Sequence, residues 1–302
     1  MPVIASMLEH LRVLLSRHQA TRDLIRNLVP DRIAVRLQVA ATERGIRTFR
    51  RRTAHHRFGD QPLKVVIADP VGEEWYDHDW PLPAEVALLA DSKLVEGATV
   101  IEVGAHQAVV AMMLAGIVGP SGRVVAVEAN PHDYAVACEN LKLNKAANIV
   151  MVNRAAAAAP GLLTFNITGR VSDDATTTGN VLTDAVTVDM LAEEYGQPDV
   201  IFIDTEGYEG EVLKGAKTAL QASPDVFVEV HAGRPLRRFD SSVRAILDCL
   251  SSESYEVLVG TDAYPFAPLD EVDPELLDSR FFLVARKRES HSSASTGAGH
   301  VG

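Results

Sequence analysis

The chain has 302 residues, 47% of them hydrophobic, with a mean hydropathy close to zero and a formal net charge of −12. This composition fits one large water-soluble α/β domain with an appendage, and it excludes a membrane-spanning protein because no apolar run reaches the roughly 18 residues that a bilayer requires. Glu9, His10 and Arg12 interrupt the first apolar stretch, where a secretory signal needs an unbroken core, so we expect a cytoplasmic protein.

Residues 1–57 form a basic segment that the apolar pattern predicts to be helical. The segment holds twelve arginines against four acidic residues, a net charge of +8, whereas the rest of the chain holds 17 basic against 37 acidic residues, a net charge of −20. Apolar side chains recur at helical spacing twice before Pro30, and a third helix is expected from Asp31 to about Arg44.

Two kinds of partner suit these amphipathic helices. Arginines opposite apolar stripes are typical of a helix that lies on an anionic membrane surface or against an acidic partner, which would place the protein at the membrane periphery. Alternatively, the helices pack on the acidic domain of the same chain, or of a second copy in a homodimer. Nucleic acid is not an expected partner, because the charge of −20 on the rest of the chain repels phosphates.

Residues 58–98 are expected to form a linker, a lid and a lead-in helix. A short strand is predicted from Leu63 to Ala68, and the loop after it holds both tryptophans, Trp75 and Trp80, which suits a lid or a wall of an acceptor site. The run Asp77-His78-Asp79 could bind a metal. We expect none, because neighbouring side chains in an extended loop point in alternating directions and no further His or Cys pattern supports them.

The most informative stretch runs from Thr99 to Asn144. It begins with a short apolar run, Thr99–Val103, followed by a turn at Gly104 and Ala105 and by apolar residues at helical spacing as far as Ile117. Glycine at the turn lets the backbone approach a ligand closely, and the start of the helix leaves N–H groups free to bind acceptor atoms. The pattern therefore indicates a strand, a ligand-binding turn and a helix.

A second strand in this stretch, Arg123–Val127, ends at Glu128. A carboxylate at the tip of the second parallel strand is placed to accept both hydroxyls of a ribose, which predicts a ligand containing adenosine. The preceding turn reads GAHQAV and lacks two of the three glycines of the dinucleotide pattern G-x-G-x-x-G. Without the middle glycine a pyrophosphate has no place against the backbone, which favours S-adenosylmethionine (SAM) over NAD.

Later strands bring acidic side chains to the same edge. The run Asp199–Asp204 reads as a buried strand that ends in a carboxylate, and Glu206 follows it closely. The next strand, Asp225–Glu229, leads to His231. Because ligands bind outside the carboxyl ends of the strands in an open parallel sheet, we expect these side chains to face the crevice that also holds the turn and Glu128.

Seven strands are predicted within residues 99–285, which we assign to one Rossmann-like domain with a mostly parallel sheet and helices on both faces. The predicted strands are 99–103, 123–127, 148–153, 199–204, 225–229, 255–259 and 281–285. Either Asn153 or Arg154, at the end of the third, is expected to lie near the adenine. The remaining residues, 286–302, are rich in Ser, Gly and Ala and are expected to be a disordered tail.

Several motifs form a recognisable set. They are Glu102-Val-Gly104-Ala; Glu128-Ala-Asn130-Pro131 with Tyr134, Asn140 and Asn144; Val188-Asp189-Met-Leu191; and Asp204-Thr-Glu206-Gly207-Tyr-Glu209 with Val212, Leu213, Gly215 and Ala216. With these motifs the chain resembles the FkbM family of SAM-dependent methyltransferases over about residues 64–260. The block around Asp204 is the most specific, whereas the glycine turn is common to class I methyltransferases. This chain has Ala108 where the usual turn carries a second glycine.

The resemblance implies the class I fold, SAM as cofactor, and methyl transfer to a hydroxyl oxygen of polyketides, nodulation factors or sugars of glycolipids and polysaccharides. We therefore expect an O-methyltransferase that acts on a hydroxyl of such a sugar or of a natural product. Two alternatives remain open. One is an NAD-dependent oxidoreductase, and the other is a non-catalytic SAM-binding module that residues 1–57 recruit to an anionic membrane or a carrier protein.

Methyl transfer to an aliphatic hydroxyl calls for a base, because the hydroxyl is a poor nucleophile. We expect Asp204, His231 and Glu206 to be catalytic, with Asp204 orienting the imidazole of His231. The candidate cofactor-binding residues are Glu102, Gly104, Ala105, Glu128, Asn130, Asn153 and Asp204. Within that set, Glu102 is expected to hold the ammonium group of SAM and Gly104 to lie beneath its methionine part.

Overall fold

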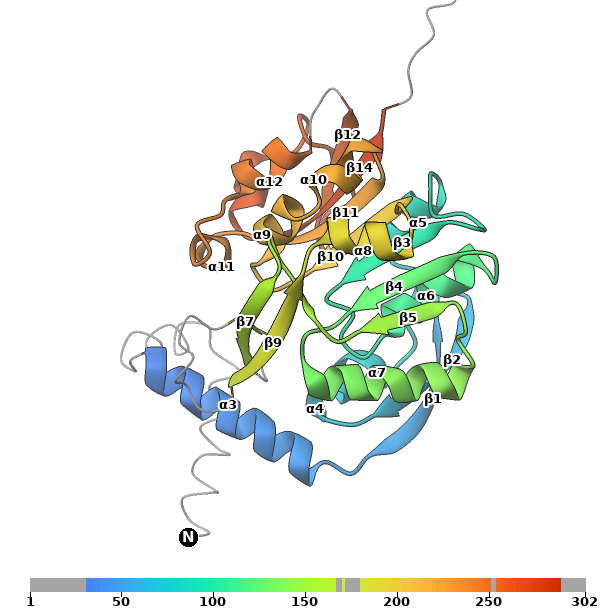
Figure 1. Cartoon of the computed structure of the whole chain (residues 1–302), viewed down its shortest axis with the longest axis vertical. Helices are drawn as coiled ribbons and strands as arrows, with labels where there is room; N and C mark the ends of the chain where they lie inside the picture. Colours follow the sequence, from blue (N-terminus) through green and yellow to red (C-terminus); the bar gives the residue numbers. More distant parts are fainter. Residues whose placement is uncertain (1–30, 167–169, 172–179, 251–253, 289–302) are drawn as a thin grey trace, which may run out of the picture.

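The computed structural model describes residues 31–166, 170–171, 180–250 and 254–288 (Figure 1). The helices expected before Pro30 and the tail residues 289–302 lie outside this part of the chain. The first described element is α3, Asp31–Thr48, which extends beyond the predicted end of the third helix. None of the helices in the described ranges combines the length and the apolar character needed to cross a membrane.

A main sheet of eight strands forms the centre of the described chain (Figure 1). In spatial order the strands are β13 (Ala267–Pro268), β12 (Tyr255–Gly260), β14 (Arg280–Lys287), β11 (Asp225–His231), β10 (Val200–Asp204), β3 (Thr99–Val103), β4 (Arg123–Val127) and β5 (Ile149–Val152). Neighbours from β11 to β5 are parallel, whereas β14 is antiparallel to both β11 and β12. The predicted Rossmann-like fold is confirmed, and the short β13 adds an edge strand to the seven expected.

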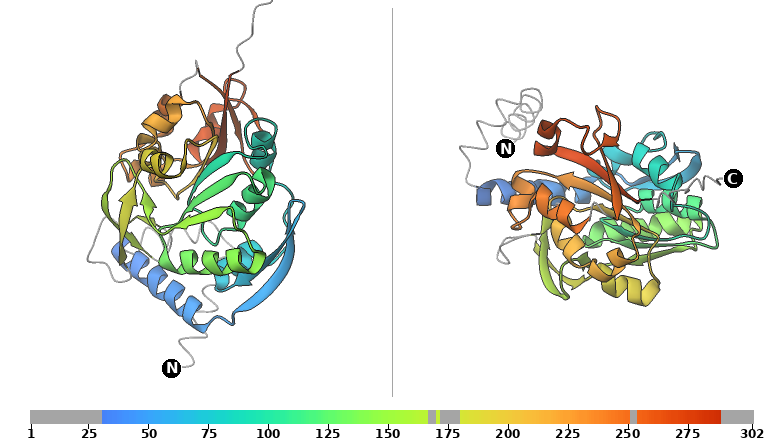
Figure 2. Two further views of the ribbon diagram at one scale, coloured as in Figure 1. Left: turned by 45° about the vertical axis from the view of Figure 1, so that its right-hand side comes forward. Right: turned by 90° about the horizontal axis from the view of Figure 1, so that it is seen from above.

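Helices cover both faces of the main sheet, because successive apolar side chains of each strand point to opposite faces (Figure 2). On one face, Val100 of β3 lies in a core with α5 and α6, and on the other Ile101 lies in a core with α8, α9 and α12. The helices around the sheet are α5 (Ala84–Ala90), α6 (Val109–Val118), α7 (Pro131–Asn144), α8 (Val188–Tyr195), α9 (Glu209–Lys214), α10 (Lys217–Gln221), α11 (Arg234–Arg237), α12 (Val243–Cys249) and the 3-10 helix η1 (Pro274–Asp278).

Before the main sheet the chain forms a hairpin of β1 (Arg52–Phe58) and β2 (Gln61–Ile67). The expected helical segment 1–57 is therefore wrong at its end, since residues 52–57 are a strand. The exposure of side chains along β1 alternates toward the buried Phe58, which is the two-residue period of a strand rather than the period of a helix.

Two asparagines of α7 join this hairpin to the main domain. The side-chain oxygen of Asn140 accepts the N–H of Val66 at 2.7 Å, and that of Asn144 accepts the N–H of Lys64 at 2.9 Å. Both belong to the motif set recognised in the sequence. They satisfy backbone groups of β2 that no neighbouring strand covers on that side, so their role is to dock the hairpin.

The loop predicted to carry the tryptophans is partly helical. Helix α4, Pro70–Tyr76, begins there because the carboxylate of Asp69 caps its first turn and proline suits the first helical position. The tail begins later than expected, since Arg286 and Lys287 still belong to β14.

A second, four-stranded sheet stands beside the main one. Its strands, in spatial order, are β6 (Ala155–Ala156), β9 (Asn180–Val186), β7 (Gly161–Asn166) and β8 (Arg170–Val171). Figures 1 and 2 show β7 and β9 projecting away from the main sheet toward α3. The expected residues 99–285 thus contain this small sheet in addition to the Rossmann-like core.

Candidate functional site

A cavity of about 1540 Å³ opens at the carboxyl ends of β4, β3, β10 and β11. Gly104, Glu128 and Asp204 all line it, so the three residues expected to share one crevice do lie together. The other expected site residues in its wall are Glu102, Ala105, Asn130, Glu206 and His231. Helix α3 also contributes to the wall, with Ala41, Thr42, Gly45 and Ile46.

The turn after β3 requires glycine for a reason that the sequence did not reveal. Gly104 has a φ of +90°, and a Cβ atom at this position would lie 1.7 Å from the carbonyl oxygen of Asp204. The missing side chain therefore lets the end of β10 pack against the turn. Gly104 also lines the cavity, and the expected close approach of its backbone to a ligand stays a prediction.

Ala108 begins α6 in the left-handed conformation, with a φ of 62°. This backbone geometry is the physical reason for a glycine at the position, because alanine is strained there. The methyl group of Ala108 is fully buried in the apolar core, and Ala108 is not among the described residues that line the cavity. The alanine therefore leaves the cavity unobstructed.

Replacing Ala108 by glycine is expected to leave the dissociation constant for SAM unchanged and to alter the free energy of unfolding by less than about 1 kcal/mol. Relief of left-handed strain, about 1 kcal/mol, is offset by the larger unfolded-state entropy of glycine and by the lost burial of one methyl group. Calorimetric titration with SAM and urea unfolding measure the two quantities. A large change in SAM affinity would show that the methyl group acts on the cofactor site after all.

Glu128 is buried at the tip of β4, where backbone groups hold its carboxylate. One oxygen accepts the N–H of His106 and the other accepts the N–H of Asn130, each at 2.7 Å. Burial raises the pKa of Glu128 to about 8, and the nearby carboxylate of Asp133 adds to this shift. Each carboxylate oxygen can accept a second hydrogen bond, so acceptor capacity for two hydroxyls remains at a fixed position in the cavity wall.

Glu102, on β3, is 2% exposed and carries an oxygen without a hydrogen-bond partner among the described residues. Burial, together with the neighbouring carboxylates of Asp204 and Glu128, raises the pKa of Glu102 to about 8. A cation placed beside Glu102 would stabilise its ionised form. The ammonium group of SAM is such a cation, so Glu102 fits the ammonium group and Glu128 fits the ribose of this cofactor.

Because the folded-state pKa of Glu102 lies above its ordinary value, the stability it contributes is present at low pH and is lost as the pH rises to about 8. We expect the free energy of unfolding to fall between about pH 5 and pH 8, by up to about 1.4 kcal/mol per unit for this proton. The Glu102→Gln variant should lose part of this dependence, measured by urea unfolding across the range. The exposed Glu96→Gln serves as the control, and an unaltered slope in Glu102→Gln would contradict the assignment.

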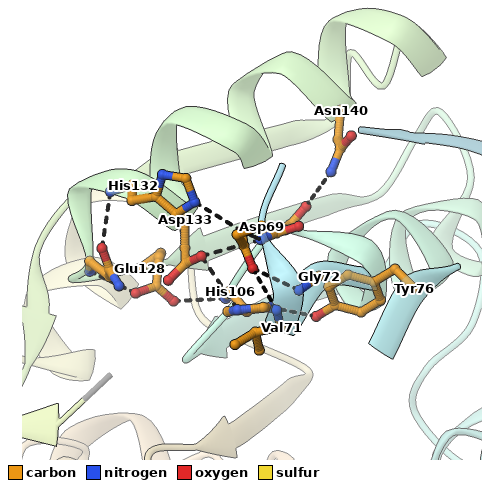
Figure 3. Close-up of polar contacts among 11 residues, drawn as sticks. Asp69, Val71, Gly72, Tyr76, His106, Glu128, His132, Asp133 and Asn140 are labelled. Carbon is orange, nitrogen blue, oxygen red and sulfur yellow. Dashed lines mark hydrogen bonds and ion pairs between the residues drawn. The ribbon is translucent and has the colours of Figure 1, made fainter. Parts of the chain in front are cut away.

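Asp69 is the main residue of the site that sequence analysis missed. Its carboxylate is 3% exposed and accepts the N–H groups of Val71 and Gly72, the side-chain amide of Gln107 at 2.7 Å and the imidazole of His132 at 2.9 Å (Figure 3). Despite burial, which would raise it, these contacts lower the pKa of Asp69. The Asp-Pro pair at the start of α4 is the sequence signal that could have identified it as a helix cap.

Tyr76 connects α4 to the turn after β3. Its hydroxyl lies 2.8 Å from Nδ1 of His106, and Nε2 of His106 lies 3.4 Å from the carboxylate of Asp133 (Figure 3). His106 lines the cavity and anchors the helix that carries Tyr76. Together with the contacts of Asp69, those of Tyr76 and His106 fix α4 to the turn after β3 and to the start of α7.

Asn153 has a different place from the one expected. It is not among the described residues that line the cavity, and its side-chain amide donates to the backbone oxygen of Glu128 at 2.8 Å. Asn153 therefore positions the end of β4, because it holds the backbone of the residue whose carboxylate faces the cavity. Arg154, the next residue, does line the cavity.

Several acidic side chains surround His231 at the tips of β10 and β11. Nδ1 of His231 lies 2.7 Å from a carboxylate oxygen of Glu209, and Nε2 lies 3.5 Å from Glu229, which Arg280 also contacts. The expected pairing of His231 with Asp204 is therefore wrong, since the carboxylate that hydrogen-bonds the imidazole is that of Glu209. Asp204 nevertheless lies close by, with one ligand atom each of Asp204, Glu229 and His231 within 4.8 Å of one another, a spacing that a metal ion could bridge.

Burial and the neighbouring charges determine the protonation of His231 and Asp204. Burial alone would lower the pKa of His231, but the hydrogen bond to Glu209 and the charges of Glu206 and Glu229 raise it to about 9. Burial raises the pKa of Asp204 well above its ordinary value, and Glu229 adds to the shift. The site therefore holds a strongly basic imidazole beside a carboxyl group that retains its proton easily.

Aromatic side chains also line the cavity, among them both tryptophans of the loop expected to form a lid or wall. Trp75, Tyr76 and Trp80 all line the cavity, and the ring of Trp80 lies 5.7 Å from that of Tyr76. Phe266 and Phe282 line it as well, with ring centroids 6.5 Å apart. The carboxylates of the neighbouring run have other partners, since Asp77 and Asp79 both contact His56.

A sequence profile described as the methyltransferase FkbM domain matches residues 102–257, just over half of the chain. A second profile, described as protein-L-isoaspartate(D-aspartate) O-methyltransferase, matches residues 22–157. The hexuronic acid methyltransferase AglP of Haloferax volcanii is 41% identical to the chain over 76 residues. That alignment spans 24% of this chain and 30% of the relative.

Solved structures of methyltransferases also resemble the chain, at low identity. A SAM-dependent O-methyltransferase from Thermotoga maritima is 13% identical, with a TM-score of 0.41 and 77% of each chain covered. Fibrillarin from Aeropyrum pernix, solved with bound SAM, is 13% identical, with a TM-score of 0.40 and coverage of 64% of this chain and 68% of the other.

Proposed function

Because the chain belongs to the FkbM methyltransferase family, with SAM as methyl donor, we propose that it methylates a hydroxyl of a sugar in a glycolipid or polysaccharide, or of a natural product. The observation that carries this proposal is a single cavity shared by two groups of side chains. Glu102 and Glu128, the proposed cofactor ligands, line this cavity, and Asp204 and His231 line it at the adjacent strand tips. Family membership removes the NAD-dependent oxidoreductase as an alternative.

The chain's own residues have separate tasks in this proposal. SAM supplies, when bound, a methyl group on a positively charged sulfur. Glu128 accepts the ribose hydroxyls and Glu102 holds the ammonium group, while Trp80 and Tyr76 exclude water from the acceptor side. His231 takes the proton of the acceptor hydroxyl, and Asp204 and Glu206 accept hydrogen bonds from other hydroxyls of the acceptor.

Two observations favour a sugar among the hydroxyl-bearing acceptors. The cavity combines aromatic rings with several carboxylates, and carboxylates are pure acceptors that suit a molecule rich in hydroxyl donors. The relative AglP is described as a hexuronic acid methyltransferase, which makes sugar acids the first acceptors to test.

The test uses SAM with a deuterated methyl group and two model acceptors, methyl glucoside and methyl glucuronide, followed by mass spectrometry. We expect the label in an ether that survives mild base, and S-adenosylhomocysteine as the co-product. Extracts of cells that express the protein widen the search if neither model acceptor reacts. A label released by mild base would be a carboxyl ester, which would overturn the assignment to a hydroxyl.

We also propose that the basic segment 1–57 contacts an anionic membrane surface. Arg44 and Arg47 of α3 are exposed, and no ion pair joins them to the part of the chain that the structure describes. The same helix lines the cavity, so such a surface would lie beside the acceptor entrance. Other arginines favour the intramolecular alternative, because Arg51 pairs with Glu139 and Arg52 with Glu73.

Reversing the charge of both Arg44 and Arg47 to glutamate is expected to weaken binding to phosphatidylglycerol vesicles by about tenfold or more, since each basic residue near an anionic surface contributes about 1 kcal/mol. Vesicle co-sedimentation at low and high salt measures this. Arg244→Glu, at an exposed pair with Asp248, is the matched control. If the wild-type protein, the double variant and the control bind the vesicles equally, the membrane proposal is wrong. The basic segment then makes contacts within the chain or between two copies in a homodimer.

A further inference from the structure

The side chain of Glu209 lies at the first turn of α9 and is fully buried. One of its oxygens lies 2.7 Å from Nδ1 of His231 and also accepts the N–H of Gly207 at 2.8 Å. The other oxygen has no hydrogen-bond partner among the described residues. Glu209 is therefore held at a fixed position against one nitrogen of a histidine whose ring lines the cavity.

The chain builds this contact from two neighbouring strand ends. Strand β10 is followed by a tight turn in which Glu206 and Gly207 both have positive φ, and the turn directs Glu209 back toward the sheet. A Cβ at Gly207 would lie 2.7 Å from Pro235, so the turn can adopt this path only with glycine. Strand β11 pairs with β10 so that Glu229 lies opposite Asp204, which places His231 just beyond the end of β10.

We propose that Glu209 is the positioning residue that orients His231 as the base for the acceptor hydroxyl, an inference that rests on the proposed function. A carboxylate only accepts hydrogen bonds, so the neutral imidazole must carry its proton on Nδ1. Its lone pair is then on Nε2, the nitrogen on the side of Glu229 and Asp204. Glu209 thus selects the tautomer that can act as a base.

The same contact strengthens the base. The hydroxyl proton passes to the lone pair of Nε2 as the hydroxyl oxygen bonds to the methyl carbon, and the electrons of the broken C–S bond remain on sulfur. The imidazolium formed is paired with the buried carboxylate of Glu209. Glu209 therefore stabilises the charge that develops on the histidine during the reaction.

The test compares Glu209→Gln and Glu209→Ala with Glu211→Gln, a change of equal charge two residues along α9 at a side chain that pairs with Lys214. Glutamine keeps an oxygen for the N–H of Gly207 but removes the negative charge. The first readout is ¹⁵N NMR of the imidazole of His231 in the protein without SAM, assigned by its absence in His231→Asn. We expect the pKa of His231 to fall by about one to two units in Glu209→Gln and to stay unchanged in Glu211→Gln.

The second readout is the pH dependence of kcat/KM for the acceptor that the labelling experiment identifies. The wild-type rate should rise with pH as His231 loses its proton, near pH 9. In Glu209→Gln this rise should move to lower pH, and in Glu209→Ala the plateau should drop by about tenfold or more because the imidazole is no longer oriented. Glu211→Gln should follow the wild-type profile.

Three results would overturn the proposal: an unshifted His231 titration in Glu209→Gln, an unmoved pH profile, or loss of activity with EDTA and recovery with Mg²⁺ that depends on His231. The last would make His231 a metal ligand rather than a base. The proposed function fails separately, if the wild-type protein transfers no methyl group to any hydroxyl. The NMR titration does not depend on activity, so the two failures can be distinguished.

Discussion

Glu128→Ala is expected to raise the dissociation constant for SAM by about a hundredfold or more, the largest binding effect of any single change in the cavity. The carboxylate would accept two hydroxyls of the ribose, and each hydrogen bond to a charged group contributes about 1.5–3 kcal/mol. Truncation also leaves the buried N–H groups of His106 and Asn130 without their acceptor, which loosens the turn. Calorimetric titration with SAM at pH 8 measures the loss.

The control for this prediction is Glu139→Ala, at an exposed carboxylate of α7 that pairs with Arg51. It removes the same atoms from the neighbouring helix and should leave SAM affinity unchanged. Thermal unfolding of both variants shows whether the turn is still folded. If Glu128→Ala binds SAM as tightly as the wild-type protein, the ribose assignment is wrong, and the cofactor end of the cavity must be placed elsewhere.

His231→Asn is expected to lower the rate of methyl transfer by about a hundredfold to ten-thousandfold at pH 9, because a positioned base contributes a factor of this size. SAM affinity should not change, since the ring lies at the tip of β11 rather than beside Glu128. Single-turnover measurements at saturating SAM isolate the transfer step. The side-chain amide of asparagine can still donate a hydrogen bond to Glu209, so the effect reports the lost base rather than a lost contact.

Asp204→Asn separates the two candidates for the base. It removes a carboxylate but leaves the contact between Glu209 and His231 intact, so we expect a smaller loss than in His231→Asn. The opposite order, with Asp204→Asn nearly inactive and His231→Asn nearly normal, would show that Asp204 takes the proton directly.

The sequence predicted the parts of the site that depend on strand order. Glu128 and Asp204 each end a strand of a parallel sheet, and parallel strands present their carboxyl ends at one edge, so their meeting follows from topology. The pattern of hydrophobic residues along the sequence was enough to locate those strands. The roles assigned to these residues as cofactor ligand and catalytic group stay predictions.

What the sequence missed depends on contacts between distant segments. Asp69 contacts Gln107 in the turn after β3 and His132 in α7 only because the hairpin and α4 pack against α7. No local sequence pattern predicts that packing. Glu209 was recognised only as part of a motif, because its partner His231 lies 22 residues later on the next strand. The rule that parallel strands end together places His231 near Asp204, but it does not say which of several carboxylates its ring will contact.

The attachment of α4 to the turn after β3 has a consequence for ligand affinity. Asp69 and Tyr76 join α4, which forms part of the cavity wall, to residues of the turn beside Glu128. A ligand that immobilises the turn therefore also stabilises this part of the wall. By thermodynamic linkage, a ligand at the turn then raises the affinity for a ligand at the wall, and the reverse effect has the same size. We therefore expect positive cooperativity, in which bound SAM raises the affinity for the methyl acceptor and the bound acceptor raises the affinity for SAM by an equal factor.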